Sequence, residues 1–428
     1  MGAKKKYPEP FRRPDSQDSK VYYFMLEGKD GKRHRMSTGE TSKELAREFI
    51  RTYLDDQRSG STALTFAEYA EPFYIPETCP HFIRYRQEGK SIGLQHLSQC
   101  RSLLKRHVLT DVAFARRPIA KIKRGDLLDL RSRLLKSGMG VNTVNKCVSA
   151  TKTILSEASF RGDIDFNPGA EVGDIKYQKT ERAILTPEEI GAFLAFLGER
   201  TKRTMTLAKG ATPIKPGAKE SRQALDAAQA MRDEAMLSFL FCTGARAAEI
   251  QALRWSAIDL NTGRCCIEKA FKGKDGLGLP KWGKVRDIML AKLVLERLKA
   301  WKKLSSPDLQ SDCFVFGTPD GKWLGYEGLH NVLENALKEA RDEKILPDDE
   351  RLITSHSARH SLNTNLLAAG VAPLLVQSFL GWSSAEARIL TRVQVAYTHL
   401  SLLRVEDVAK AVDLMYAPPK TKRQEQLG

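Results

Sequence analysis

The sequence predicts a multidomain protein of the α+β class, mainly α-helical with small β-sheets. The chain has 428 residues, 42% of them hydrophobic, which is enough material for two or three cores. Apolar residues recur at helical spacing along most of the chain. Runs of strand length and composition occur near the N-terminus and again between residues 265 and 316.

The N-terminal region predicts a small domain behind a basic arm. Residues 1–20 contain three lysines in a row, prolines and few apolar side chains, a composition typical of a mobile arm. The apolar run 21–26 and the segment 32–36 flank a glycine-containing turn and predict a β-hairpin. Thr41 and Glu44 have capping-box spacing, so a helix should follow.

The next region predicts a compact helical bundle, because its leucines and valines keep a helical period. Between Arg101 and Lys136 it carries eleven basic residues and only three acidic ones. Such a run is either a solvated surface or a face that contacts phosphates.

The last region predicts a mixed α/β domain. Thr186 and Pro187 mark a helix start, and residues 201–222 have the composition of an exposed insertion. Strands are expected at 265–267, 285–290 and 313–316, with helices elsewhere. The predicted domains are therefore 1–60, 63–178 and 182–428.

Composition restricts the partner and the compartment. Lys and Arg number 69 against 52 Asp and Glu, a net charge of +17 spread along the chain, which favours nucleic acid over an acidic membrane surface. The sequence contains neither an apolar run of membrane-spanning length nor a signal-like start, so a membrane span and secretion are disfavoured. The seven cysteines lack zinc spacing and indicate reduced thiols in a cytoplasm.

The segment 242–250 contains the first candidate for chemistry. An apolar helix breaks at Thr243-Gly244 and restarts at once, which places Arg246 at a helix N-terminus where guanidinium and backbone N–H groups can meet a phosphate. The alternative is a helix–helix corner in which Glu249 pairs with this arginine.

The segment 354–360 contains the second candidate for chemistry. His356 and Arg359 lie three residues apart at a predicted helix start and so share one face. His356 and His360 also have the i, i+4 spacing of a metal site, but position 357 is serine and no further ligand follows at useful spacing.

Two single residues complete the set. Lys281 precedes a predicted strand in a turn, from which a lysine can reach into a cleft as a proton donor or simply aid solubility. Tyr397 precedes the predicted helix 404–415, where a tyrosine is either a nucleophile or a packing residue.

Taken in order, these segments resemble the tyrosine recombinase (phage integrase) family. Thr243-Gly244-Ala245-Arg246-Ala247-Ala248-Glu249 is similar to its first arginine box, Lys281 to its hairpin lysine and His356-Ser357-Ala358-Arg359 to its H-x-x-R box. Leu380-Gly381-Trp382 and Tyr397-Thr398-His399 are similar to its last two boxes. Position 382 is Trp where most bacterial members have His, and the stretch from there to Tyr397 is several residues longer than usual.

The resemblance covers residues 184–416 and implies the fold and the chemistry of that family. The segment 63–178 resembles its core-binding domain, and 20–57 its small arm-type DNA-binding domain. Tyr397 would attack a DNA phosphodiester, with Arg246 and Arg359 on the phosphate, Lys281 and His356 moving protons and Trp382 packing or donating an N–H. Neither a metal nor a cofactor is implied, and Glu249 would support the first arginine box.

The resemblance also implies the partners. These are double-stranded DNA attachment sites, three further copies of the chain in a tetramer that exchanges the helix 404–415, and accessory proteins that bend DNA or set direction. Within the basic run, the expected DNA contacts are Lys105, Arg106, Lys121, Lys123 and Arg124. The expected location is the cytoplasm of a bacterial host, at the nucleoid.

Three other functions remain open at this stage. A type IB topoisomerase shares the tyrosine chemistry, but the arm-like N-terminal unit argues against it. A DNA-binding protein of the same fold that has lost catalysis is disfavoured by the complete set of site residues. A chromosome-dimer resolvase normally lacks the extra N-terminal unit, which favours the integrase of a mobile element.

Overall fold

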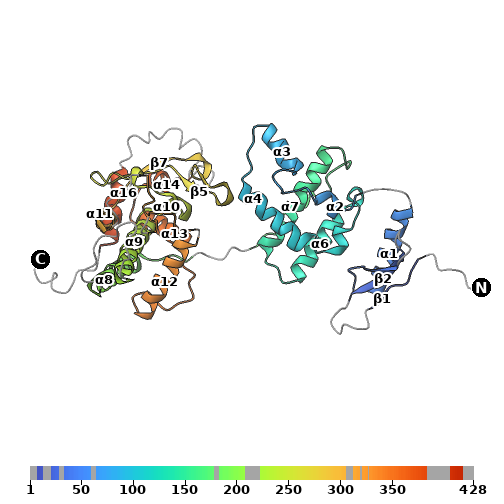
Figure 1. Ribbon diagram of the computed structural model, residues 1–428, viewed down its shortest axis with the longest axis horizontal. Helices are drawn as coiled ribbons and strands as arrows, with labels where there is room; N and C mark the ends of the chain where they lie inside the picture. Colours follow the sequence, from blue (N-terminus) through green and yellow to red (C-terminus); the bar gives the residue numbers. More distant parts are fainter. Residues whose placement is uncertain are drawn as a thin grey trace, which may run out of the picture. The chain divides into compact units, whose positions relative to one another are not determined.

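The computed structural model of the chain describes residues 7–12, 21–27, 33–58, 64–177, 183–207, 222–304, 312–318, 321–325, 327–382 and 405–417 (Figure 1). The chain divides into two compact units, Met1–Lys179 and Thr180–Gly428. The first unit contains both the small N-terminal domain and the helical domain that the sequence predicts. The division into three domains therefore stays a prediction.

A three-stranded antiparallel sheet and one helix form the N-terminal part of the first unit. The strands lie in the order β1 (Phe11–Arg12), β2 (Tyr22–Glu27), β3 (Arg33–Ser37), and α1 (Lys43–Arg58) follows. Phe24 is fully buried, as is Ile50 of α1, and their burial joins sheet and helix. The hairpin and the helix confirm the prediction. Strand β1 was not predicted, because two residues carry no periodic signal and their pairing comes from contact with Tyr22 and Tyr23.

The rest of the first unit is the helical bundle that the sequence predicts. It consists of α2 (Phe66–Ala70), α3 (Pro80–Gln87), α4 (Leu94–Leu103), the π-helical turn η1 (Leu104–Val108), α5 (Val112–Ala115), the 3-10 turn η2 (Ile119–Lys121), α6 (Arg124–Lys136) and α7 (Val141–Phe160). One core joins these helices, with α7 contributing side chains along its whole length, from Val144 to Ala158. The periodicity was sufficient here because each helix buries one apolar stripe.

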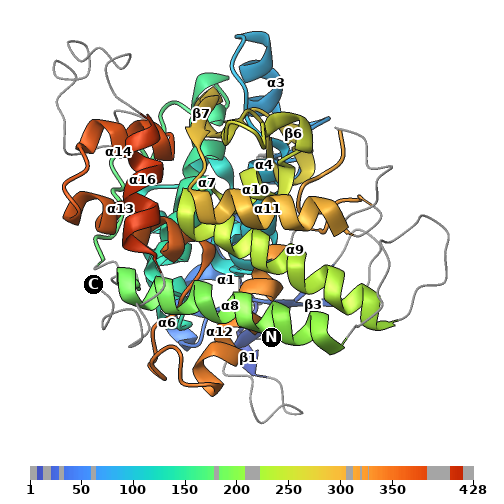
Figure 2. The same cartoon turned by 90° about the vertical axis from the view of Figure 1, so that its left-hand side faces the viewer.

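The second unit is built around a central helix. Its helices are α8 (Pro187–Leu207), α9 (Arg222–Thr243), α10 (Ala247–Ala252), α11 (Lys292–Leu304), α12 (Gly328–Asp342), α13 (Ser355–Ala368), α14 (Pro373–Leu380) and α16 (Val405–Met415), with a short 3-10 turn η3 (Trp255–Ala257) after α10. Helix α9 contacts α8, α10, α11, α12 and α13, and Figure 2 shows α8 and α11 running beside it. The insertion predicted at 201–222 is wrong for residues 201–207, which continue α8 as a helix, and for Arg222, which begins α9. Residues 208–221 lie outside the described part.

Two small antiparallel ribbons lie within the second unit. Strand β4 (Arg264–Ile267) pairs with β7 (Arg286–Met289), and β5 (Ala270–Phe271) pairs with β6 (Leu277–Gly278). The 3-10 turns η4 (Gly273–Asp275) and η5 (Lys281–Gly283) lie in the connection between β4 and β7. The strand expected at 313–316 is wrong: Phe314 forms only an isolated bridge with Arg254, and the apolar run is explained by the burial of Val315 and Phe316 in the core.

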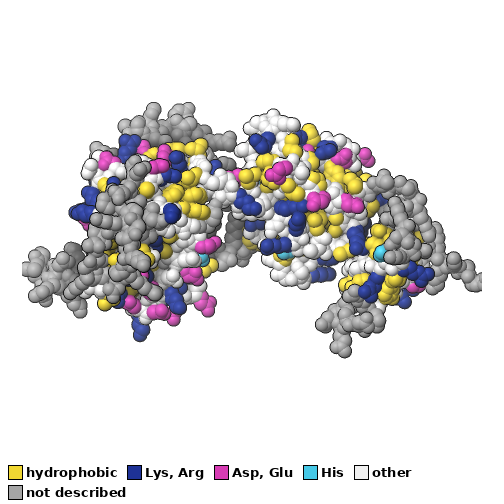
Figure 3. All heavy atoms as spheres, viewed as in Figure 1, with side chains coloured by type: hydrophobic (Ala, Val, Ile, Leu, Met, Phe, Trp, Pro, Cys, Tyr) yellow, Lys and Arg dark blue, Asp and Glu magenta, His cyan; other side chains and the backbone are white. Residues whose placement is uncertain are grey.

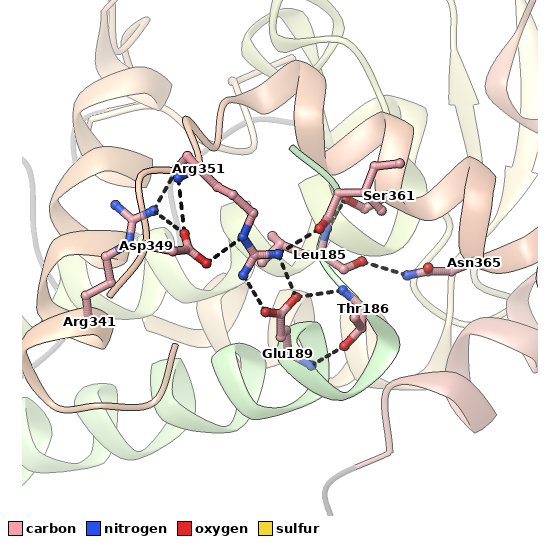
Figure 4. A network of polar contacts seen from close by, with 9 residues as sticks. Leu185, Thr186, Glu189, Arg341, Asp349, Arg351, Ser361 and Asn365 are labelled. Carbon is pink, nitrogen blue, oxygen red and sulfur yellow. Dashed lines mark hydrogen bonds and ion pairs between the residues drawn. The ribbon is translucent and has the colours of Figure 1, made fainter. Parts of the chain in front are cut away.

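A polar network fixes the start of α13 against the start of α8 (Figure 4). Arg351 donates through Nη2 and Nη1 to the carboxylate of Glu189 at 2.5 and 3.2 Å, and through Nε to Asp349 at 2.6 Å. The Glu189 carboxylate also accepts the N–H of Thr186 at 2.8 Å, which closes the capping box of α8. The helix that carries His356 and Arg359 therefore begins at a fixed point of the unit.

Helix α16 packs on its own unit. Val408, Val412 and Tyr416 are buried in the core, and Asp413 accepts the N–H groups of Lys292 and Leu293 at the start of α11. The helix predicted for exchange between copies is thus seated within its own chain. None of the described helices is both long and apolar enough to cross a membrane.

Candidate active site

The corner between α9 and α10 positions Arg246. Gly244 adopts a left-handed φ of +58°, and a Cβ there would lie 2.8 Å from a methyl carbon of Leu380, so both backbone and space require glycine. Ala245 is fully buried and carries the chain to Arg246, the N-cap of α10, whose backbone is extended. The predicted break and restart of the helix are confirmed. The side chain of Arg246 keeps 18% of its surface exposed.

Glu249 supports this corner from inside the protein. It is 2% exposed and accepts the N–H of Arg246 at 2.9 Å and Nη1 of the same residue at 3.0 Å. Burial raises the pKa of Glu249, but the hydrogen bonds and charges of Arg286 and Arg246 outweigh it, so the net pKa lies below its ordinary value. Both interpretations of this segment therefore apply: it is a helix corner with a paired arginine, and the arginine side chain is still partly exposed.

Helix α13 brings the second arginine to the same place. Thr354 caps the helix, with its Oγ1 accepting the N–H of Ser357 at 3.2 Å. Arg359 is only 2% exposed; its Nη1 donates to the carbonyl of Gly244 at 2.8 Å, and its Nη2 donates to the carbonyl of Leu380. One guanidinium thus joins the first arginine corner to the end of α14, across 115 residues of sequence.

His356 lies one turn before Arg359, at the exposed start of α13. Its ring meets that of His360 edge to face, with centroids 5.0 Å apart. In the part of the chain that the structure describes, no three His, Cys, Asp or Glu side chains are grouped to hold a metal ion.

Lys281 lies on the long connection between β4 and β7. It begins the turn η5, is exposed and stands five residues before Arg286. Nearby, Lys284 donates through Nζ to the carbonyl of Trp382 at 3.2 Å, which brings the lysine segment to the end of α14. Lys281 is therefore on the connection of an antiparallel pair, as expected, but in a 3-10 turn rather than at a tight hairpin tip.

Trp382 follows the C-cap of α14 and packs partly buried on the core. The guanidinium carbon of Arg359 lies 5.7 Å from the centroid of its ring, within the range of a cation–π contact. Tyr397 lies outside the described residues. Five of the six predicted catalytic residues therefore lie among the described residues. Hydrogen bonds and the cation–π contact join Arg246, Arg359 and Trp382 through the Gly244 corner and the end of α14.

Arg286 was missed by the sequence analysis. It begins β7, is 8% exposed and donates to Glu249 at 2.7 and 3.2 Å and to the carbonyl of Phe379 at 2.9 Å. A signal was available: strand alternation places this arginine on the same face as buried Ile288, where an unpaired charge is not tolerated.

The predicted DNA-contacting residues lie in the first unit, and all five are exposed: Lys105, Arg106, Lys121, Lys123 and Arg124. Of these five, Arg124 pairs with Glu171 at 2.7 Å. Further members of the basic run also have local partners. Arg101 donates to the carbonyl of Glu71 at 2.8 Å, and Arg133 pairs with Asp111 at 2.7 Å. On the visible face of both units, Lys and Arg are interspersed with acidic and apolar side chains (Figure 3).

Comparisons with known proteins identify a family and relatives. Residues 218–401 match the model of the phage integrase family. The tyrosine recombinase XerD of Listeria monocytogenes serotype 4b is 33% identical over 180 residues, which are 42% of this chain and 54% of that protein. The XerD of Listeria innocua is 25% identical over 289 residues, 68% of this chain and 82% of that protein.

Solved structures share the fold. The integrase of the transposon Tn1549, in complex with transposon right end DNA, has a TM-score of 0.54 at 16% identity and covers 85% of this chain and 98% of its own. A lambda integrase tetramer bound to a Holliday junction has a TM-score of 0.51 at 14% identity, covering 90% of this chain and 94% of its own. At these identities the likeness concerns the fold alone.

Proposed function

The chain belongs to the phage integrase family of tyrosine recombinases, and from this membership we propose that it is a site-specific DNA strand transferase of a mobile genetic element. The observation that carries the proposal is the bond from Arg359 to the carbonyl of Gly244, which brings two arginine segments to one place. A buried, fixed guanidinium beside a partly exposed one suits a phosphate whose oxygens gain charge during reaction.

In the proposed reaction, the phenolate of Tyr397 attacks the scissile phosphorus of a DNA strand. A P–O bond to tyrosine forms as the P–O5′ bond breaks, which leaves a 3′-phosphotyrosine and a free 5′-hydroxyl. Arg246 and Arg359 stabilise the charge on the non-bridging oxygens. A 5′-hydroxyl of another strand reverses the step, so the energy of the broken bond is kept in the phosphotyrosine and no ATP is consumed.

The remaining site residues move protons or support the phosphate. Lys281 protonates the leaving 5′-oxygen, and His356 assists removal of the proton from the tyrosine. Trp382 packs against Arg359 or donates its indole N–H. The exposure of Lys281 and His356 supports these roles, because both side chains face the solvent from which a DNA substrate approaches.

The first unit is proposed to bind the sugar–phosphate backbone of the DNA. The exposed residues Lys105, Arg106, Lys121, Lys123 and Arg124 would contact phosphates, which fixes position without reading sequence. The small sheet and α1 would form an arm-type DNA-binding domain for a second DNA segment.

Strand exchange needs four cleaved strands, so the proposed assembly is a tetramer on two double-stranded attachment sites. Exchange of α16 between copies would first require it to leave its own core, where Asp413 caps α11. DNA-bending and direction-setting proteins are further proposed partners.

The test is an adduct assay on nicked duplexes that span the ends of the encoding element, without metal or ATP. Wild type should form an SDS-resistant protein–DNA adduct, and Tyr397→Phe should bind the same duplex but form none. Tight binding without any wild-type adduct would favour a DNA-binding protein that has lost catalysis. Relaxation of supercoiled plasmid without exchange between two sites would favour a type IB topoisomerase.

A further inference from the structure

The starting observation is a buried arginine that the proposed reaction does not use. Arg286 opens β7, pairs across the ribbon with Ile267 and is 8% exposed. A guanidinium remains charged inside a protein, so its position must be matched by partners.

Its partners all belong to segments that hold the proposed reacting groups. Nη1 and Nη2 donate to the two oxygens of Glu249 at 3.2 and 2.7 Å, a bidentate pair. Nε donates to the carbonyl of Phe379 at 2.9 Å, in the last turn of α14. The same Glu249 carboxylate holds the backbone and the side chain of Arg246.

Gly381 makes room for this arrangement. It is the C-cap of α14 with a left-handed φ of +66°, and a Cβ there would lie 2.8 Å from Nη1 and 2.9 Å from Cδ of Arg286. The Arg286 guanidinium therefore packs directly against the end of α14, beside the Leu380 carbonyl that accepts a hydrogen bond from Arg359.

The lysine segment is tied to the same helix end. Lys284 donates to the carbonyl of Trp382. Two residues further along the chain, Arg286 donates to the carbonyl of Phe379. The segment that follows Lys281 is thus fixed by two hydrogen bonds to the C-terminal end of α14 and the residue after it.

We propose that Arg286 is a positioning residue of the strand-transfer site. Through Glu249 it holds Arg246, and through the end of α14 it fixes the acceptor of Arg359. The turn η5, which begins with Lys281, lies directly before the strand that Arg286 opens. This inference rests on the proposed function, because it assigns to Arg286 the orientation of groups that act on a DNA phosphate. Removal of the bidentate pair leaves Arg246 without a fixed carboxylate, and a misplaced group of this kind costs about 10²-fold in rate.

The experiment compares single-turnover cleavage of two nicked duplexes by the full chain. One has an ordinary phosphodiester at the cleavage site, and the other has a methylphosphonate, which is neutral and therefore needs little cationic stabilisation. The variants are Arg286→Met, Arg286→Lys and Arg246→Ala. Arg264→Met is the matched control, because it lies on the neighbouring strand β4 with its side chain 65% exposed.

We expect Arg286→Met to cleave the phosphodiester about 10²-fold more slowly than wild type, with DNA affinity within about twofold. On the methylphosphonate its rate should lie within about tenfold of wild type, as should that of Arg246→Ala, because the missing orientation matters only for a charged phosphate. Arg286→Lys should be intermediate, since an ammonium keeps the charge but not the bidentate geometry. Arg264→Met should match wild type on both duplexes.

Two outcomes would overturn the inference. Equal loss on both duplexes would show a general structural role, and full activity of Arg286→Met on the phosphodiester would show no role in the reaction. If Arg286→Met does not fold, as judged by circular dichroism, the same comparison of duplexes with Arg286→Lys decides. A wild type that cleaves neither duplex would refute the proposed function before any variant is compared.

Discussion

The basic residues of the two units are used in opposite ways. In the second unit, Arg359 and Arg286 are 2% and 8% exposed, and each donates to backbone carbonyls or to a buried carboxylate. In the first unit, Lys105, Arg106 and Lys123 are exposed. A buried guanidinium is oriented before the substrate arrives, whereas exposed charges attract a polyanion from a distance and release its counterions.

The same contrast exists within the basic run of the first unit. Arg101 forms an ion pair with Glu71 and Arg133 forms one with Asp111, so both positive charges are already partnered within the protein. The density of basic residues in a sequence therefore overstates the number of phosphate contacts. Substitution of a buried, paired group should therefore change stability or cleavage, whereas substitution of an exposed basic residue should change the salt dependence of DNA affinity.

The largest effect is expected for Glu249→Ala. It leaves Arg286 buried without its carboxylate, and breaking a buried pair in this way costs about 3–5 kcal/mol of unfolding free energy. Chemical denaturation of wild type, Glu249→Ala and the exposed neighbour Glu268→Ala measures it. A loss below about 1 kcal/mol for Glu249→Ala would show that the buried arginines do not depend on this carboxylate.

Gly381→Ala tests whether the fit around Arg286 is tight. The left-handed backbone and the contact with the guanidinium should together cost about 1–3 kcal/mol, and cleavage should fall while DNA affinity is kept. The matched control is Gly125→Ala, because a Cβ there meets nothing within 4 Å and the residue lies in α6. That substitution should be neutral or slightly stabilising. Equal stability of the two variants would contradict the packing described here.

The double variant Lys105→Ala/Arg106→Ala tests the exposed set. The slope of log affinity against log salt concentration is negative, and each lost phosphate contact makes it shallower by about 0.9. Two lost contacts should therefore make it shallower by about 1.8, with the unfolding free energy unchanged. Cleavage at saturating DNA should match wild type. Arg101→Ala is the contrasting variant, since it should lower the unfolding free energy and leave the salt slope unchanged. If Arg101→Ala changed the salt slope and the double variant changed stability instead, the distinction between paired and exposed basic residues would be wrong.

The sequence predicted the helices well because their signals are local. Gly244 and Arg246 are adjacent in the chain, and the capped start of α13 follows from Thr354 and the residues after it. The bond from Arg359 to Gly244 could be expected only from the family resemblance, since nothing local encodes a contact across 115 residues.

What the sequence could not provide depends on three-dimensional packing. The run at 313–316 has strand composition but forms no ladder. Its residues Val315 and Phe316 are buried in the core, and burial alone already favours such residues. Strand alternation could have indicated that Arg286 faces inward, but its partners Glu249 and Phe379 come from distant segments that only the fold brings together. The pairing of Arg101 with Glu71 likewise depends on packing, since the two residues lie 30 positions apart in the chain.

The smallest effect should be the pH dependence of the network at the start of α8. Burial raises the pKa of Glu189, but hydrogen bonds from Arg351 and from the N–H of Thr186 outweigh it, so the net pKa lies below its ordinary 4.5. The unfolded chain then takes up a proton before the folded one, so the stability from Glu189 is complete above about pH 4.5 and is lost as the pH falls through the lower, folded pKa. The difference in unfolding free energy between wild type and Glu189→Gln should be about 0.5–1 kcal/mol at pH 7 and shrink below pH 4.5. Glu188→Gln, at the exposed neighbouring position, should show no such difference, and a gap that persists unchanged at low pH would mean that the Arg351 contacts do not act through charge.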